Sequence, residues 1–259
     1  PESWLKYYQQ TNIPMSRVSN WAKEKYREET GSIHKTPNAS HGIYTEDDIR
    51  QSLESYAAGI SFVDEQIGRV INALKEAGQY ENTLILYTSD HGDMMGDQYM
   101  WRKCRPYEPS ARIPMIIRWP ESLNINAKRG AIFNELVELR DIFPTFSDVA
   151  GIDIPAKIDG ESMMNVIRGE KKWRHILDLE HSQIYEPDNA WVALTDGKYK
   201  YIYFTLTGEE QMFDLQNDPY ELNNVLAGQY ESRLHKKWYK MMVKHLNIRG
   251  SDWVLNNKL

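Results

Sequence analysis

The sequence predicts an α/β fold with a small antiparallel sheet and a helix added at its C-terminal end. Residues 45–152 carry, in order, a helical pattern, a short apolar run, a polar loop, a second apolar run and another helical pattern. This order is typical of a layered α/β fold. After about residue 160 the apolar positions alternate with polar ones between turn dipeptides, which indicates antiparallel strands.

The first helix is predicted over 46–77. Thr45 can cap its N-terminus, with Asp48 at the reciprocal position of a capping box. Gly78 follows where a C-terminal glycine is expected. Apolar side chains recur every three or four residues, which predicts a single buried stripe, made of Ile49, Leu53, Tyr56, Ile60, Val63, Ile67, Val70 and Leu74.

Two apolar runs predict strands of one sheet. "TLILYT" (83–88) is continuous, which is typical of a strand covered on both faces, as in parallel sheets. "PMIIRW" (114–119) predicts a neighbouring or near-neighbouring strand of a mixed sheet. "LVELRDIFPTFSDVAGI" (136–152) predicts a helix that breaks or kinks near Pro144. Residues 1–44 read as polar and irregular.

The pattern of apolar and polar residues changes in the C-terminal part. Residues 190–215 alternate and contain Asp-Gly and Thr-Gly turn signals, which predicts a separate antiparallel meander. Residues 229–246 predict a closing amphipathic helix. We therefore divide the chain into 1–160, part of a main α/β domain, and 161–259, a small α+β subdomain.

Composition excludes several classes of function. The chain has 259 residues and a net charge of -6, so nucleic acid and anionic lipid are not expected as general partners. A single cysteine, Cys104, excludes an intrachain disulfide and leaves the redox compartment open. There is no apolar run long enough to predict a membrane span. Pro1 is not an initiator residue, so we expect a mature or cut product.

Asp90 and His91 directly follow the first predicted strand. Ligands of open α/β sheets bind beyond the carboxyl ends of strands, and a carboxylate beside an imidazole suits a divalent metal. The alternative is that Asp90 caps a turn and His91 makes one structural hydrogen bond. Lys103, in the loop that follows, could pair with a substrate anion as a point charge. Its alternative is an ordinary solvated lysine.

Other polar residues near these positions have simpler interpretations. Arg112 is expected to hold the loop by pairing with Glu108, and Cys104 to be incidental. Three loop methionines are expected to be wall and core residues, namely Met94, Met95 and Met100. His181, in the polar stretch "LEHSQIYEPDNAW", is a weak candidate for facing a substrate; a surface or packing role is the alternative.

Five blocks in order resemble the sulfatase family of the alkaline-phosphatase-like superfamily. The resemblance covers roughly residues 45–228. The blocks are "YAAGISFVDEQIGRVINAL", "TLILYTSDHG", "GDQYMWRKCRPYEPSARIPMIIRWP", "VELRDIFPTFSDVAGI" and "GEEQMFDLQNDPYELNNV".

The resemblance implies an alkaline-phosphatase-like mixed sheet covered by helices and a partial active site. Asp90 and His91 would be ligands of a divalent metal, Ca²⁺ first, with Mg²⁺ or Mn²⁺ as alternatives. Lys103 would contact the sulfate oxygen that becomes the leaving group. The substrate would be a sulfated small molecule or glycan, and a periplasmic or secreted location would be favoured. Gln98 stands where the family often has His, and is given no role.

The family's nucleophile is a formylglycine made from Cys or Ser in a Cys/Ser-x-Pro-x-Arg motif of the N-terminal half. "CRPYE" at Cys104 imitates only the start of that motif and lies after the metal strand, so we reject it. The chain is thus expected to be a C-terminal portion that works with its own N-terminal half and is inactive alone. Two alternatives stay open: a phosphonate or phosphate monoester hydrolase, since the Asp-His form also occurs in such relatives, and a non-catalytic module that lost the nucleophile.

Overall fold

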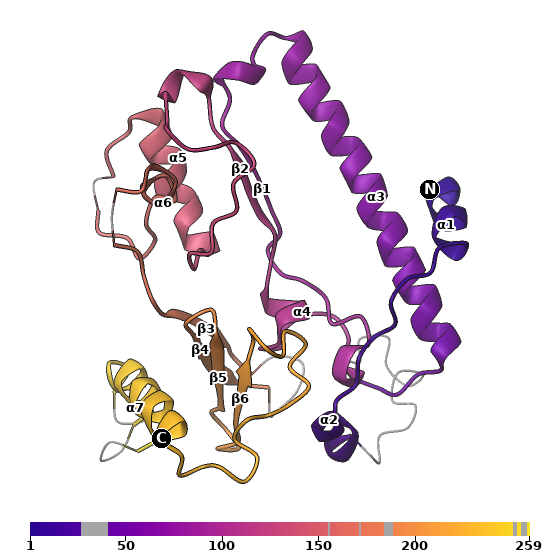
Figure 1. Ribbon diagram of the computed structural model, residues 1–259, viewed down its shortest axis with the longest axis vertical. Helices are drawn as coiled ribbons and strands as arrows, with labels where there is room; N and C mark the ends of the chain where they lie inside the picture. Colours follow the sequence, from indigo (N-terminus) through magenta and orange to yellow (C-terminus); the bar gives the residue numbers. More distant parts are fainter. Residues whose placement is uncertain (27–40, 155, 171, 184–188, 251–252, 255–257) are drawn as a thin grey trace.

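A computed structural model of the chain describes residues 1–26, 41–154, 156–170, 172–183, 189–250, 253–254 and 258–259. The fold is α/β, with a two-stranded and a four-stranded antiparallel sheet (Figure 1). The helices are α1 (Glu2–Gln9), α2 (Asn20–Lys25), α3 (Glu46–Glu76), α4 (Glu108–Ala111), α5 (Ile142–Ala150), α6 (Met164–Arg168) and α7 (Arg233–Asn247). The strands are β1 (Ile85–Thr88), β2 (Met115–Arg118), β3 (Leu177–His181), β4 (Trp191–Thr195), β5 (Tyr199–Phe204) and β6 (Glu210–Asp214). Short 3₁₀ turns are η2 (Tyr80–Asn82), η3 (Asp97–Tyr99), η4 (Glu121–Leu123) and η5 (Leu139–Asp141).

Strands β1 and β2 pair with each other, which confirms that 83–88 and 114–119 are neighbours. The pairing is antiparallel, with Tyr87 opposite Ile116. The expectation that the first strand is covered on both faces is wrong within the described residues, because Tyr87 is 38% and Ile116 62% exposed. An apolar run indicates that its side chains are suited to burial. It does not identify the segment that buries them.

The start and end of α3 match the prediction. Thr45 caps the helix: its Oγ1 accepts a hydrogen bond from the Asp48 amide (3.2 Å) and donates one to the Asp48 carboxylate (2.6 Å). The helix ends at Glu76, and Gly78 adopts a left-handed φ of +65° just beyond it. A residue with a Cβ is disfavoured in that conformation, so the sequence signal for the end was sound.

The predicted buried stripe of α3 is not buried in the described structure. The main partner of α3 is α1, which lies beside it (Figure 1). The two helices are joined by hydrogen bonds from Trp4 to Glu65 (3.1 Å) and between Tyr8 and Ser61 (2.7 Å). Four side chains of the stripe are 44–63% exposed, namely Tyr56, Ile60, Val63 and Val70. The stripe and the exposed side of β1–β2 thus form one set of apolar surfaces without a partner among the described residues.

Two further predictions need correction. Residues 1–44 are not wholly irregular, since they contain α1 and α2. Helix α2 is short and starts at a capping serine, Ser19, whose Oγ accepts from the Ala22 amide (3.1 Å).

Pro144 does not kink a helix, because it lies in the first turn of α5, where a missing N–H breaks no helical hydrogen bond. The chain changes from a 3₁₀ turn to an α-helix before Pro144, after Asp141.

The C-terminal sheet confirms the predicted meander and adds β3 at its edge. Its order is β3-β4-β5-β6, with every pair antiparallel. Helix α7, predicted over 229–246, covers one face through Trp238, Met242 and Leu246, which pack against β4 and β5 residues such as Val192 and Tyr201. Both faces of the sheet are buried, because the second face packs on a different set of side chains.

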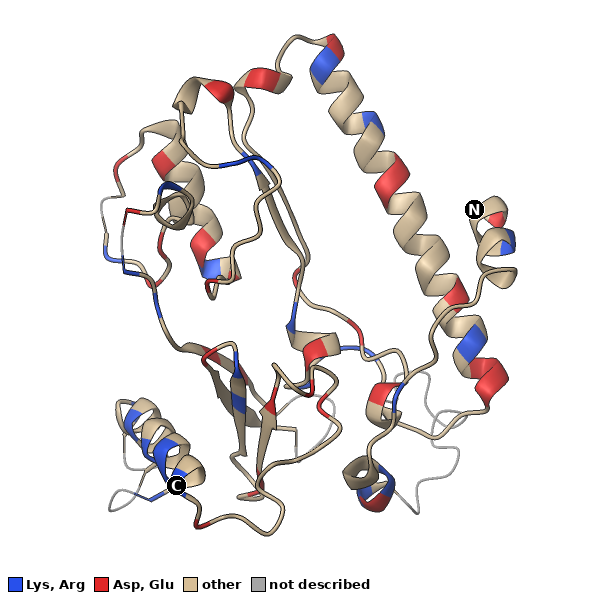
Figure 2. Cartoon of the chain, viewed as in Figure 1, with Lys and Arg blue, Asp and Glu red and all other residues tan. Residues whose placement is uncertain are grey.

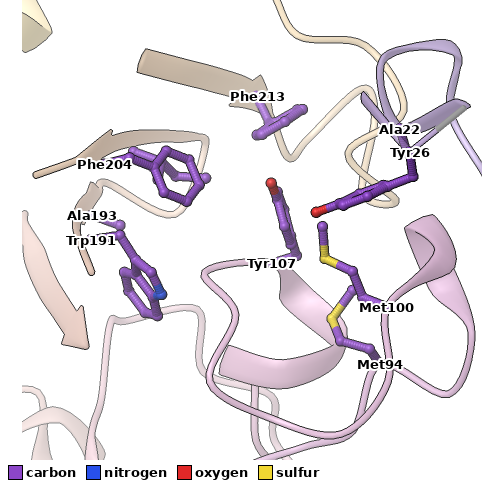
Figure 3. Close-up of a cluster of buried hydrophobic side chains, with 10 residues drawn as sticks. Ala22, Tyr26, Met94, Met100, Tyr107, Trp191, Ala193, Phe204 and Phe213 are labelled. Carbon is purple, nitrogen blue, oxygen red and sulfur yellow. The ribbon is translucent and has the colours of Figure 1, made fainter. Parts of the chain in front are cut away.

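That second face forms a core with the segment after β1. Figure 3 shows Met94 and Met100 beside Tyr107, with Phe213 and Trp191 contributed by the sheet. Met94 and Met100 are each 1% exposed, as expected of core residues. Side chains from both sides of residue 160 share this core, and the division into 1–160 and 161–259 stays a prediction.

Charges are distributed unevenly over the helices. Figure 2 shows both acidic and basic residues along α3, whereas Lys and Arg prevail on α7. Within the described segments, no helix combines the length and the apolar character that crossing a membrane requires.

An ion pair buried at the start of α5 links that helix to the C-terminal sheet. Asp141 is fully buried and accepts from both terminal nitrogens of Arg174 (2.5 and 2.6 Å). It also accepts from the amides of Glu138 and Glu161, each at 2.9 Å. Arg174 lies just before β3, so this carboxylate connects three segments.

We predict that Asp141→Ala lowers the free energy of unfolding by about 3–5 kcal/mol, because it removes the fully buried carboxylate that binds two amides and leaves Arg174 paired with Glu138 at 3.5 Å. Asp178→Ala is the matched control: Asp178 pairs with Arg140 (2.9 Å) at a half-exposed site. That change should cost less than about 1 kcal/mol. Urea unfolding followed by circular dichroism measures both, and equal losses would contradict the prediction.

Candidate active site

Asp90 and His91 lie just beyond the C-terminal end of β1, where the sequence places them. The turn is held locally: Ser89 Oγ donates to the His91 carbonyl (2.6 Å), and the His91 amide donates to Asp90 Oδ1 (3.1 Å). The Asp90 side chain is 83% and the His91 side chain 38% exposed. The second Asp90 oxygen therefore faces outward.

The tautomer of His91 is fixed by its own turn. Its Nδ1 lies 2.7 Å from the Gly92 carbonyl oxygen, which can only accept, so Nδ1 carries the proton. Nε2 then carries the lone pair, 3.6 Å from Asp90 Oδ2. A histidine that donates through one nitrogen and offers the other is the usual arrangement of a metal ligand. The donor set therefore fits a divalent cation.

Two ligands do not make a complete metal site. Among the described residues, there is no cluster of three or more His, Cys, Asp or Glu side chains suited to a metal. Asp90 and His91 would thus hold a cation only with further ligands.

Gly92 ties the end of β1 to α4. Its amide donates to the Ser110 carbonyl (2.8 Å). A Cβ at residue 92 would lie 2.0 Å from the Pro109 carbonyl oxygen, far inside van der Waals contact. Only glycine allows this approach, so the position of Asp90 and His91 depends on a residue with no side chain.

The loop from 93 to 103 returns the chain to the same end of β1. Asp93 Oδ1 accepts from the amides of Met95 (2.9 Å) and Arg102 (3.0 Å). The Met94 amide donates to the Arg102 carbonyl (2.8 Å). Lys103 is the next residue, so the loop brings it back beside the segment that carries His91. The Lys103 side chain is exposed and, within the described part of the chain, forms no ion pair.

The segment after Lys103 is held by the C-terminal sheet. The Cys104 carbonyl accepts from Asn189 Nδ2 (3.0 Å) and Trp191 Nε1 (3.1 Å). The buried Arg105 donates to Asn189 Oδ1 (3.2 Å). Burial raises the pKa of the Cys104 thiol, although Lys103 and Arg105 oppose this, so the thiolate is disfavoured.

His181 reaches the same segment through Asn189. It ends β3, stacks on Trp191 with ring centroids 6.0 Å apart, and its Nδ1 lies 3.0 Å from the Asn189 carbonyl oxygen. Nδ1 is therefore the protonated nitrogen and Nε2 the acceptor. Residues 184–188 of the stretch "LEHSQIYEPDNAW" lie outside the described residues.

Two other residues have clear structural roles. Gln98 is 2% exposed; it accepts from the Ser19 amide (2.8 Å) and donates to the Tyr220 carbonyl (3.2 Å), so it ties α2 to the loop. Arg112 lies 3.7 Å from Glu108, as expected, but it is mostly exposed.

Sequence reasoning missed a buried ionic cluster under the loop. Lys200 of β5 is 1% exposed, and its Nζ lies 2.7 Å from Glu108 and 2.9 Å from Glu221. The signal was a lysine inside the apolar alternation of "KYKYIYF", where a solvated side chain has no room. Its partners are 92 residues before it and 21 after it in sequence, so spacing could not reveal them.

The Sulfatase family model matches residues 8–152, and the model for the C-terminal region of N-sulphoglucosamine sulphohydrolase matches residues 96–248. An arylsulfatase from Clostridium perfringens is 37% identical over all of this chain and 53% of its own length.

Two solved structures are similar in fold. A phosphonate monoester hydrolase from Silicibacter pomeroyi superposes with a TM-score of 0.75 at 26% identity, over 95% of this chain and 53% of that one. The structure of a protein in complex with its substrate D-glucosamine-2-N,6-O-disulfate superposes with a TM-score of 0.68 at 28% identity. The match covers 90% of this chain and 45% of that one. The chain thus spans about half the length of these relatives. The matched family models, together with the order of the elements around β1, show that the chain belongs to the sulfatase family.

Proposed function

We propose that the chain supplies part of the active site of a sulfuric ester hydrolase. Asp90 and His91 would hold a divalent cation, and Lys103 would face the leaving oxygen of a sulfate ester. The observation that carries the proposal is the His91 Nε2 lone pair lying 3.6 Å from Asp90 Oδ2 at the end of β1. Membership of the sulfatase family supports sulfate esters as the substrate class.

A bound cation would act as a Lewis acid toward the sulfate oxygens. Asp90 contributes a negative charge to its site, and His91 contributes a neutral nitrogen while keeping its proton on Nδ1. Ca²⁺ takes about 6–8 oxygen ligands, so these two residues require partners from outside the described chain. We propose Ca²⁺, with Mg²⁺ or Mn²⁺ as alternatives.

Lys103 is suited to contact a substrate anion because its ammonium group is exposed and without an ion-pair partner in the described structure. A positive charge next to the departing oxygen stabilises the negative charge that develops there. His181 would accept a hydrogen bond from a hydroxyl or amide of a sulfated small molecule or glycan, because its Nδ1 is already occupied.

We propose that the nucleophile, a formylglycine, belongs to an N-terminal half that also covers the apolar surfaces of this chain. The support is physical. Exposed apolar side chains lie on α3 and on the Tyr87–Ile116 side of β1–β2, and large exposed apolar side chains in such numbers are typical of an interaction site. The chain also spans about half of its relatives.

A phosphonate or phosphate monoester hydrolase is the second candidate, supported by the superposition on the phosphonate monoester hydrolase. We expect the complete gene product to cleave aryl sulfates faster than aryl phosphonates or phosphate diesters with the same leaving group. Initial rates on such a matched panel decide between the two. A preference for phosphonates would favour the second candidate, and no turnover of any ester would favour a module that lost the nucleophile.

Variants should separate metal binding from anion contact. In the complete gene product, Asp90→Ala should lose bound metal and turnover together, and His91→Ala should act in the same direction but less, because a neutral imidazole contributes less charge. Lys103→Ala should keep its metal and lose about 10²–10³-fold in rate, most on esters with poor leaving groups. Elemental analysis beside kinetics on aryl esters of graded leaving-group acidity measures this. Loss of metal in Lys103→Ala, or equal slowing of all esters, would refute the assignment.

The 259-residue chain by itself should hydrolyse no sulfate ester above background and bind divalent cations weakly, because its described residues offer two proposed ligands and no group of three or more. Isothermal titration with Ca²⁺ and Mn²⁺, alongside a fluorogenic aryl sulfate assay, tests this. Turnover by the pure chain would show that our division of the site is incorrect.

A further inference from the structure

A buried lysine and a buried glutamate of the C-terminal sheet region lie directly under the segment that follows Lys103. Lys200 Nζ donates to the Pro106 carbonyl (2.9 Å) and to Glu221 Oε1 (2.9 Å). Glu221 Oε2 accepts from the Glu108 amide (2.6 Å). Lys200 and Glu221 thus hold one backbone group of residue 106 and one of residue 108, three and five residues beyond Lys103.

The rest of the same segment is held in the same way. Cys104 accepts two hydrogen bonds through its carbonyl, from Asn189 and Trp191. Alternate residues from 104 to 108 are therefore each fixed by a side chain from or near the C-terminal sheet. Arg102 and Cys104, on either side of Lys103, both have positive φ values (+63° and +72°). Non-glycine residues keep that conformation only where surrounding contacts impose it.

Stability alone does not explain a fully buried ion pair here. Well-packed apolar residues of similar volume are often as stabilising as a buried pair, or more so. Burial alone would lower the pKa of Lys200, but Glu221 and Glu108 outweigh it and raise that pKa above its ordinary value. Burial raises the pKa of Glu221, and Lys200 opposes that rise. The lysine is therefore held charged, with its donors directed at the loop.

We propose that Lys200 and Glu221 are positioning residues for Lys103, which act by fixing the backbone of residues 106 and 108. This inference rests on the proposed function for its kinetic consequence, but its structural consequence is independent of activity. Lys200 and Glu221 touch neither substrate nor metal; they set where the Lys103 segment lies.

The structural test is native-state digestion with trypsin. Arg102 and Lys103 are both exposed, so the bonds after them are available to the protease once the segment opens. In Lys200→Met and Glu221→Gln, we expect cleavage there to accelerate more than about tenfold, because cleavage follows the population of the locally open form. Mass spectrometry of the fragments identifies the sites that are cut.

Two controls make this test specific. Glu108→Gln keeps the Glu108 amide and the contacts of Lys200 with Pro106 and Glu221, but it removes one of the two carboxylates that pair with Lys200, so cleavage at 102–103 should accelerate less than in Lys200→Met. Asp141→Asn removes an equally buried charge from the other buried ion pair and should not raise cleavage at 102–103 selectively. Equal acceleration at these bonds in Asp141→Asn, or none in both Lys200→Met and Glu221→Gln, would overturn the proposal.

The kinetic test uses the complete gene product. Lys200→Met should lower turnover of poor leaving-group esters by about 10²-fold, the scale expected for a misplaced catalytic group, with metal content unchanged. Added to Lys103→Ala, it should lower turnover by less than about threefold, since residues that act through one group are not additive. Full additivity, or loss of metal in Lys200→Met, would refute positioning of Lys103. If Lys103→Ala itself has no kinetic effect, the proposed function fails, whereas the digestion result still decides the structural inference.

Discussion

Side chains of the C-terminal sheet bind the carbonyl groups of Cys104 and Pro106, and the arrangement around β1 depends on this constraint. The loop from 92 to 108 has little regular structure and several residues with left-handed backbone. Its own hydrogen bonds at Asp93 close it locally. Its attachment to Asn189, Trp191 and Lys200 decides where it lies relative to the second sheet. A buried ion pair is often no more stabilising than apolar residues of similar volume, so we assign these polar side chains a role in positioning the loop.

The end of β1 shows how a short sequence can set a chemical state. The Gly92 carbonyl determines the proton position on His91, and Gly92 itself is required by the close approach of Pro109. One glycine therefore places Asp90 and His91 and selects the tautomer of His91. The loop then returns Lys103 toward the same end of β1, so the proposed donors for a cation and the proposed charge for an anion lie within fourteen residues of sequence, 90–103.

The apolar surfaces of α3 and β1–β2 are exposed among the described residues. A helix of 31 residues with a periodic apolar stripe is usually stabilised by burying that stripe. Here four side chains of the stripe are 44–63% exposed, while side chains pack on both faces of the C-terminal sheet. The proposed metal site is likewise incomplete among the described residues, because no group of three or more His, Cys, Asp or Glu side chains suited to a metal occurs there.

The sequence by itself determined the features that depend on neighbouring residues. It located α3 with its cap, the two strands that pair, the meander with α7, and the Asp90–His91 pair at a strand end, because capping, periodicity and turn signals act over a few residues. It could not show that the α3 stripe lies exposed, that α1 and α2 are helices, or that Pro144 falls in a first turn. Lys200, Glu221 and Asn189 were found only in the tertiary structure. Their roles come from contacts across 21 to 94 residues of sequence. Such contacts form only when distant segments of the chain pack together, and no local sequence pattern predicts them.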